Sequence, residues 1–225
     1  MSHPEIQKYY EQLAAGYDDR RFANSYGRFI DRQERAILDR HLSGREGQRI
    51  LDLACGTGRL MEYCTDGLDL SSAMLDLARR KHPAKNFHLG NALHPELPDR
   101  GFDAVICFHL LMHLKKEDLA KVLTGARTLL KSGGLFIFDL PSGERRRIRR
   151  RQVEGWHGAN SYEQTEVRQY LEDRWEPVDE QGILFLPIHR FPNRLRPLLL
   201  GLDRQINRTP FKKYSSYRVY ILRKK

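Results

Sequence analysis

The sequence has few cysteines and no long apolar run. Its three cysteines, Cys55, Cys64 and Cys107, form no C-x-x-C pair, which argues against a disulfide scaffold and against a zinc site. No stretch of eighteen apolar residues occurs, so no membrane-spanning helix is expected. The first residues lack a charged start followed by an apolar stretch. We therefore expect a cytoplasmic protein that binds no metal ion.

Acidic charge is scarce in the C-terminal part of the chain. The net charge is +10, and residues 142–225 contain 19 Lys and Arg against 10 Asp and Glu, whereas the first 141 residues are almost neutral. Such asymmetry favours an anionic partner: a phosphorylated or carboxylated substrate, an acidic carrier, a membrane surface or nucleic acid. A role in solubility alone is the alternative. With 225 residues and 40% apolar content, the chain is long enough for one α/β domain.

The most informative stretch is residues 50–60, ILDLACGTGRL. The apolar run 50–54 has the length of a buried parallel strand, and it stops at two glycines, Gly56 and Gly58, that indicate a sharp turn. A helix is expected after the turn. A ligand could then lie against the glycine backbone and face the unpaired N–H groups of the helix start. The order of strand, glycine turn and helix predicts a nucleotide-type pocket.

Asp52 indicates which kind of nucleotide this pocket takes. A carboxylate near the end of the first strand would repel a pyrophosphate and attract a cation, so the ligand should carry positive charge. The dinucleotide fingerprint G-x-G-x-x-G is also broken, because Ala54 and Arg59 replace its outer glycines in one register and Met61 replaces the last in the other. These two observations disfavour a nicotinamide dehydrogenase.

The pattern Leu-Asp-Leu-x-Cys-Gly-Thr-Gly at residues 51–58 resembles the first motif of the class I S-adenosylmethionine (SAM) methyltransferases of the small-molecule type. The runs at 69–75, 90–92, 102–105, 110–114 and 131–134 resemble later motifs of that family. The resemblance implies an α/β fold: a doubly wound, mostly parallel, Rossmann-like sheet of seven strands with an antiparallel C-terminal edge strand and an N-terminal helical cap. A single domain is expected, with the cap at 1–47, the cofactor-binding core at 48–141 and substrate-side insertions at 142–225.

The resemblance also implies SAM as the cofactor and assigns residues to it. Asp69, at the end of the second strand, would accept hydrogen bonds from both ribose hydroxyls. Asn91 replaces the family's usual acid and can still accept a hydrogen bond from the adenine amino group. Met74 should lie near the adenine, and Tyr17 should close over the methionine end. The complete set of expected cofactor contacts is Tyr17, Asp52, Ala54, Cys55, Gly56, Asp69, Leu70, Met74, Asn91, Ala92, Leu93, Cys107 and Phe108.

Hydrophobic periodicity predicts the other elements. Helices are expected over 6–14, 26–38, 60–64, 72–81, 116–130, 163–174 and 197–207, and strands over 50–54, 67–70, 86–92, 102–108, 135–140 and 217–223, with a sixth strand or bent pair between 177 and 187. In the helix 26–38 the apolar residues should face inward and the charged residues outward. The helix at 60–64 should be short, because only twelve residues separate the first two strands.

Methyl transfer needs no protein nucleophile, and a general base helps only where the acceptor is a hydroxyl or an acidic carbon. His109 and His157 are the candidate catalytic residues, since a neutral imidazole is available near pH 7. The six arginines of 145–151 are interpreted either as a rim for an anionic substrate or as a solvated surface. The insertion 186–216 is expected to cover the acceptor pocket or to lie on a membrane interface.

Three functions remain open on the sequence alone. A methyltransferase acting on a small-molecule or lipid-like acceptor, which the charge predicts to be anionic, fits the motifs best. An RNA methyltransferase would explain the charge, but the Asn/Asp-Pro-Pro-aromatic motif that stacks a target base is missing after the fourth strand, so nucleic acid is the less favoured partner. A non-catalytic SAM-binding protein is the third.

Overall fold

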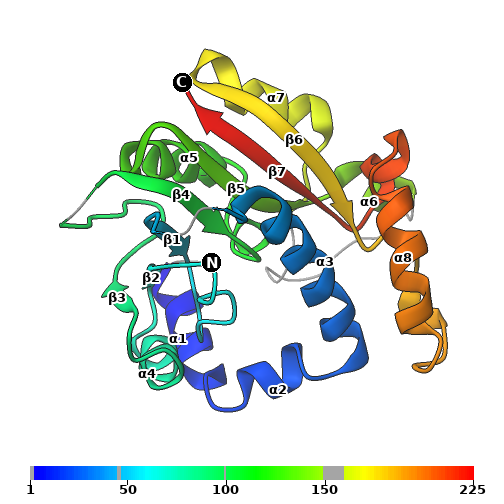
Figure 1. Cartoon of the computed structure of the whole chain (residues 1–225), viewed down its shortest axis with the longest axis horizontal. Coiled ribbons are helices and arrows are strands. Elements are labelled where there is room, and N and C mark those ends of the chain that lie inside the picture. The colour runs from blue at the N-terminus through cyan, green and yellow to red at the C-terminus, as the bar shows by residue number, and fades with distance from the viewer. Residues whose placement is uncertain (1–2, 45–46, 99, 149–159) are drawn as a thin grey trace.

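The computed structural model describes residues 3–44, 47–98, 100–148 and 160–225, which form one seven-stranded sheet with helices on both faces (Figure 1). The strand order is β3-β2-β1-β4-β5-β7-β6. The strands are β1 (Ile50–Leu53), β2 (Asp66–Asp69), β3 (Asn86–Leu89), β4 (Phe102–Cys107), β5 (Leu130–Pro141), β6 (Trp175–Ile183) and β7 (Tyr217–Lys224). The chain reverses direction across the sheet after β3, so β1 and β4 lie side by side at its centre.

The sheet is doubly wound and mostly parallel, as the sequence predicts. Strands β1 to β5 pair in parallel, whereas β7 is antiparallel to β5 and to β6. The C-terminal strand is therefore antiparallel as expected, but it lies between β5 and β6, so the outermost strand on that side is β6. Strand β6 carries a bulge between Pro177 and Asp179.

The helices divide between the two faces of the sheet. Residues of α5 and α7 pack with Leu51 and Phe136 on one face, and residues of α3 pack with Ile106 and Ile137 on the other. The α-helices are α1 (His3–Leu13), α2 (Tyr17–Arg21), α3 (Ser25–Leu42), α4 (Ser72–Lys81), α5 (Asp118–Leu129), α6 (Gly143–Ile148), α7 (Gln164–Leu171) and α8 (Arg196–Ile206). Short 3-10 helices are η1 (Leu111–His113), η2 (Glu172–Arg174), η3 (Ile188–Arg190) and η4 (Pro210–Tyr214).

Local signals fix several of these boundaries. The Ser71 hydroxyl accepts a hydrogen bond from the Met74 N–H at 3.3 Å and caps α4, which ends at Lys81, two residues before Pro83. The run 131–134, which lies between the expected helix 116–130 and the expected strand 135–140, forms a bulged start of β5, with Gly133 at φ 76°. None of the helices in the described ranges is long and apolar enough to span a bilayer.

The helix expected at 60–64 does not form. Residues 56–62 are a succession of tight turns in which Gly58 N–H bonds to Cys55 O at 2.9 Å and Tyr63 N–H bonds to Leu60 O at 3.0 Å. Twelve residues suffice to cross from β1 to β2, but they leave no room for a regular turn of α-helix in addition to the two loops. The expectation of a helix start that faces the ligand is thus wrong for this chain.

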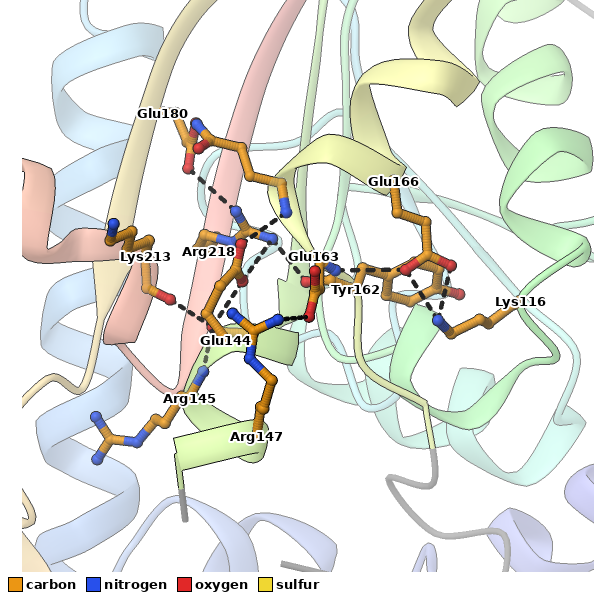
Figure 2. Close-up of polar contacts among 12 residues, drawn as sticks. Lys116, Glu144, Arg145, Arg147, Tyr162, Glu163, Glu166, Glu180, Lys213 and Arg218 are labelled. Atoms are coloured by element: carbon orange, nitrogen blue, oxygen red, sulfur yellow. Dashed lines mark hydrogen bonds and ion pairs between the residues drawn. The ribbon is translucent and has the colours of Figure 1, made fainter. Parts of the chain in front are cut away.

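A buried arginine ties the C-terminal strands to the face that α6 and α7 cover (Figure 2). Arg218 of β7 has no exposed surface, and its guanidinium donates to the Tyr162 carbonyl at 2.7 Å. Glu144 lies 3.5 Å away and Glu180 of β6 lies 3.8 Å away. Glu144 in turn accepts the Gln164 N–H at 2.8 Å, which positions the start of α7. One cation therefore balances two carboxylates from different elements.

We predict that Arg218→Met destabilises the protein by about 3 to 5 kcal/mol, because it leaves Glu144 and Glu180 without their cation. Arg223→Met on the same strand is the control. Arg223 pairs with Glu176 at 3.0 Å, but its side chain is 44% exposed, so its loss should cost about 1 kcal/mol or less. Urea unfolding of both variants measures the difference, and equal losses would contradict the structural role of Arg218.

Candidate functional site

Two adjoining cavities open at the carboxyl ends of β1, β2 and β4. The larger has a volume of about 110 Å³ and the smaller about 60 Å³. Tyr17, Ala54, Gly56, Phe108 and His109 line both, so the two form one continuous site. In open α/β sheets, ligands bind at this edge, outside the carboxyl ends of the strands.

The turn after β1 forms the wall that the cavities share. Ala54, Gly56 and Gly58 have φ angles of 73°, 54° and 80°. The N–H groups of Ala54 and Cys55 both bond to the Leu68 carbonyl, at 2.8 and 2.9 Å, which fixes the turn against β2. A Cβ on Gly56 would meet no atom within 4 Å, so its missing side chain leaves space at the cavity wall. Ala54 takes the left-handed conformation that favours glycine, which strains the backbone here.

Asp69, at the end of β2, links this turn to α4. Its carboxylate accepts the Gly56 N–H at 2.8 Å and the Ser71 N–H at 2.9 Å. Burial raises the pKa of Asp69, and these backbone hydrogen bonds oppose that shift. The carboxylate lines the larger cavity, and each of its oxygens keeps a lone pair for a further donor. The Gly56 N–H, which the sequence predicts to face the ligand, is therefore already bound by Asp69.

Asp52 lies beside the smaller cavity and is 4% exposed. Burial raises its pKa to about 7; Arg59 opposes the shift, while Asp69 and Glu34 reinforce it. Arg59 is already engaged, since its guanidinium lies 2.6 Å from Glu34 and 2.5 Å from Asp31. A carboxyl group in this setting would gain from the arrival of a further cation.

The N-terminal helices cover the site with aromatic rings. Tyr10 of α1 and Tyr17 of α2 lie edge to face at 6.2 Å, and Phe22 continues the row 6.2 Å from Tyr17. The Thr57 hydroxyl donates to the Asp18 carboxylate at 2.5 Å, and Lys81 of α4 pairs with the same carboxylate. These contacts hold α2 against the glycine turn.

A buried charge network lies at the base of the site. His109 Nε2 is 2.6 Å from Glu34 of α3, and the backbone N–H of His109 donates to the Asp139 carboxylate of β5 at 2.7 Å. Arg59 and His109 lower the pKa of Glu34 to about 2 against the effect of burial. Burial alone would lower the pKa of His109, but Glu34 and Asp139 raise it. The network therefore favours the imidazolium, whereas a general base needs the neutral ring.

The structure brings most of the predicted cofactor residues together. The larger cavity is lined by Tyr17, Ala54, Gly56, Asp69, Leu70, Met74, Asn91, Ala92, Leu93 and Phe108. Asp52 and Cys55 line the smaller one. Cys107 lines neither, because alternate strand residues face opposite sides and its side chain packs in the core with Leu111. His109 lines both cavities, whereas His157 lies outside the described residues.

Several lining residues were not predicted. Tyr10 faces the larger cavity, and Phe22 and Arg59 line the smaller; His113, a histidine that the sequence offers as a base or as a residue packing its helix, also lines the larger cavity, 6.0 Å from Tyr10. Glu34 was expected on the outward, charged side of its helix but is 1% exposed. Tyr10 could have been found from its helical face, which the sequence marks as apolar; Glu34 carries no such local signal. Among the described residues, no cluster of His, Cys, Asp or Glu is arranged to hold a metal ion.

We predict that Asp52→Asn removes a pH-dependent loss of stability. The folded-state pKa of about 7 exceeds the ordinary value of 3.8, so Asp52 stabilises the fold at low pH and loses that contribution as the pH rises toward 7. Between pH 4.5 and 7.5 the variant should gain on the order of 3 kcal/mol relative to the parent. Urea unfolding at several pH values measures this, and a constant difference would show that Asp52 ionises normally.

The part of the chain that forms this site is similar in sequence to known methyltransferases. The methyltransferase-domain family matches residues 51–138. A demethylmenaquinone methyltransferase of Symbiobacterium thermophilum is 29% identical over 147 residues, covering 59% of this chain and 57% of the relative. The chain spans about half the length of the curated relatives it matches.

Solved structures share the whole fold. A SAM-dependent methyltransferase of Thermotoga maritima superposes with a TM-score of 0.69 at 17% identity, covering 98% of this chain and 100% of that one. Magnesium protoporphyrin IX methyltransferase of Synechocystis, solved with bound SAH, gives 0.68 at 14% identity and covers both chains completely. Residues 51–138 are thus similar to the methyltransferase domain, and the chain as a whole shares the fold of these solved SAM-dependent methyltransferases.

Proposed function

We propose that the chain binds SAM across the two cavities and transfers its methyl group to a small-molecule or lipid-like acceptor. One observation carries the proposal: two carboxylates at the ends of neighbouring strands, Asp69 and Asp52, face adjoining cavities that Gly56 separates. Asp69 suits the two hydroxyls of a ribose, and Asp52 suits a cation. A nucleoside that carries a sulfonium meets both requirements. The relative solved with bound SAH supports this choice.

The adenine would lie in the apolar part of the larger cavity, beside Met74 and Leu93. Asn91 accepts the Leu93 N–H through its side-chain oxygen at 3.0 Å, which orients the amide at the cavity wall. That oxygen has a second lone pair for the adenine amino group. An uncharged acceptor in place of the family's acid should weaken this contact without removing it.

The protein's part in methyl transfer is to position the acceptor in line with the sulfonium, and orientation of this kind can lower a barrier by roughly 7 to 11 kcal/mol. The smaller cavity, lined by Tyr17, Phe22 and Phe108, would receive the apolar part of the acceptor. Because the network with Glu34 favours a protonated His109, we assign this residue to shaping the site, and His157 stays the candidate for contact with the acceptor.

The acceptor class follows from the aromatic lining and from the relatives. The Symbiobacterium relative is named for demethylmenaquinone, and the Synechocystis structure for magnesium protoporphyrin IX. An apolar acceptor of that kind agrees with the rings around the smaller cavity. Among the described residues that line the cavities, Arg59 is paired with Glu34 and Asp31, so none of them supplies an unpaired cation for the anionic character proposed for the acceptor. An anionic group on the acceptor would have to be recognised nearer the surface.

Substitution of Asp69 tests SAM binding. Asp69→Ala should weaken binding by at least about a hundredfold, because two hydrogen bonds to a charged group contribute roughly 1.5 to 3 kcal/mol each. The SAM affinity of Asp69→Asn should lie between those of Asp69→Ala and the parent. Asp76→Ala, at an exposed position on α4, should leave the SAM affinity unchanged. Calorimetry with SAM measures affinity, and transfer of labelled methyl to lipid, RNA and small-molecule fractions measures activity. Unchanged SAM binding by Asp69→Ala would reject the site.

The pH dependence of binding tests the role of Asp52. With a pKa of about 7 in the free protein, Asp52 must lose its proton to attract a sulfonium, so SAM affinity should fall by up to tenfold per unit as the pH drops below 7. Asp52→Asn should bind more weakly at pH 8 and show no such slope. SAH, whose sulfur is uncharged, is the control ligand. An equal slope for SAM and SAH would show that Asp52 does not sense the sulfonium.

A further inference from the structure

The segment between β6 and β7, residues 184–216, presents positive charge only. It contains seven Lys and Arg and a single acidic residue, Asp203. Asp203 has no exposed surface, and its carboxylate accepts hydrogen bonds from Gln33 at 2.8 Å, Asn207 at 2.7 Å and the Leu186 N–H at 2.6 Å. The only anion of the segment is therefore used inside the protein, and its outer surface carries none.

Within the described ranges, none of these seven cations forms an ion pair with a carboxylate at 4.0 Å or less. The contacts they make are to neutral oxygens: Arg196 donates to Ser25 at 2.6 Å, Arg204 to the Arg32 carbonyl at 2.6 Å and Lys212 to the Glu180 carbonyl at 2.5 Å. Burial and the neighbouring guanidiniums of Arg208 and Arg32 lower the pKa of Arg204, although the Asp39 carboxylate opposes that shift. Like charges crowded in this way would be relieved by an external anion.

The helix of this segment, α8, also exposes a stripe of leucines. Leu195, Leu198 and Leu202 are 46%, 77% and 50% exposed, and their spacing places them on one helical face. Leu199 and Leu200 on other faces pack toward the core that α3 shares. Phe211, just beyond the helix in η4, is 61% exposed. In Figure 1, α8 lies at the outside of the molecule beside α3, so the stripe is open to an approaching surface.

We propose that α8 and η4 dock on the surface of an anionic lipid bilayer. A stripe of leucines flanked by cations on a short amphipathic helix is the pattern of an interfacial helix, whose apolar side chains enter the boundary between headgroups and acyl chains. Hot spots of protein interfaces are enriched in Trp, Tyr and Arg, and leucine is under-represented among them. The absence of any exposed acid on the segment matches the negative charge of such a leaflet.

The proposed surface adjoins the site. The segment begins where β6 ends and leads into Tyr217 of β7, whose ring lies 5.8 Å from His109 at the cavity wall. Arg196 and Asp203 anchor it to α3 through Ser25 and Gln33. Docking would therefore bring the carboxyl edge of the sheet to the lipid. This inference deepens the proposed function by giving the source of a lipid-like acceptor, but vesicle binding is measured without SAM and can succeed or fail independently of it.

Vesicle flotation with phosphatidylglycerol-containing and pure phosphatidylcholine vesicles tests the proposal. The parent should bind the anionic vesicles and release them as salt rises. The double variant Leu198→Gln/Leu202→Gln should bind at least tenfold more weakly. Arg194→Gln/Arg208→Gln should lose its preference for phosphatidylglycerol, since each cation near such a surface contributes about fivefold. Leu89→Gln, at a leucine 62% exposed on β3, is the matched control and should bind as the parent does.

Three results would overturn the proposal. The parent could fail to bind either vesicle, or the leucine variant could bind as tightly as the parent. Alternatively, RNA or an acidic peptide could bind to the parent and to the leucine variant alike while displacing the vesicles, which would make this a polyanion site. Calorimetry with SAM on the leucine variant should give the affinity of the parent, because α8 contributes no residue to the cavities.

Discussion

The site depends on the burial of Glu34 between His109 and Arg59. Glu34 comes from the N-terminal cap, and its partners His109 and Arg59 come from the loops after β4 and β1. Asp139 of β5 joins the network by accepting the backbone N–H of His109. A charge with 1% exposure is stable only when its partners are in place, so breaking any one contact leaves an uncompensated ion. Four separate parts of the chain are thereby held in one relative position around the cavities.

The same network explains the unusual state of Asp52. Arg59 is the one cation that lowers its pKa, and Arg59 is shared with Glu34 and Asp31. Asp52 is therefore buried beside positive charge that is already balanced. Strain at Ala54 and His109, with φ angles of 73° and 60°, is found at the walls of the same cavities. The buried charges and the strained backbone are thus located at the same place, where a ligand would bind.

The sequence predicts those parts of the structure that local chemistry determines. Ser71 and Pro83 delimit α4 at both ends, and the apolar run 50–54 with Gly56 and Gly58 predicts β1 and its turn. The prediction of a helix at 60–64 is wrong because the connection from β1 to β2 is too short to contain one, whatever the helical propensity of its residues. Glu34 was missed because a charged residue on an amphipathic helix resembles its solvated neighbours until distant loops meet it. Cys107 lines neither cavity because the register of β4 decides which of two adjacent residues, Cys107 or Phe108, faces the cavities.

The outer strand β6 has a further consequence for the behaviour of the molecule at high concentration. An open sheet offers its last strand to other chains, but Pro177 provides no N–H for a new ladder and the neighbouring bulge interrupts the register. At the opposite end β3 is only four residues long. Both margins thus oppose the addition of a strand from another chain.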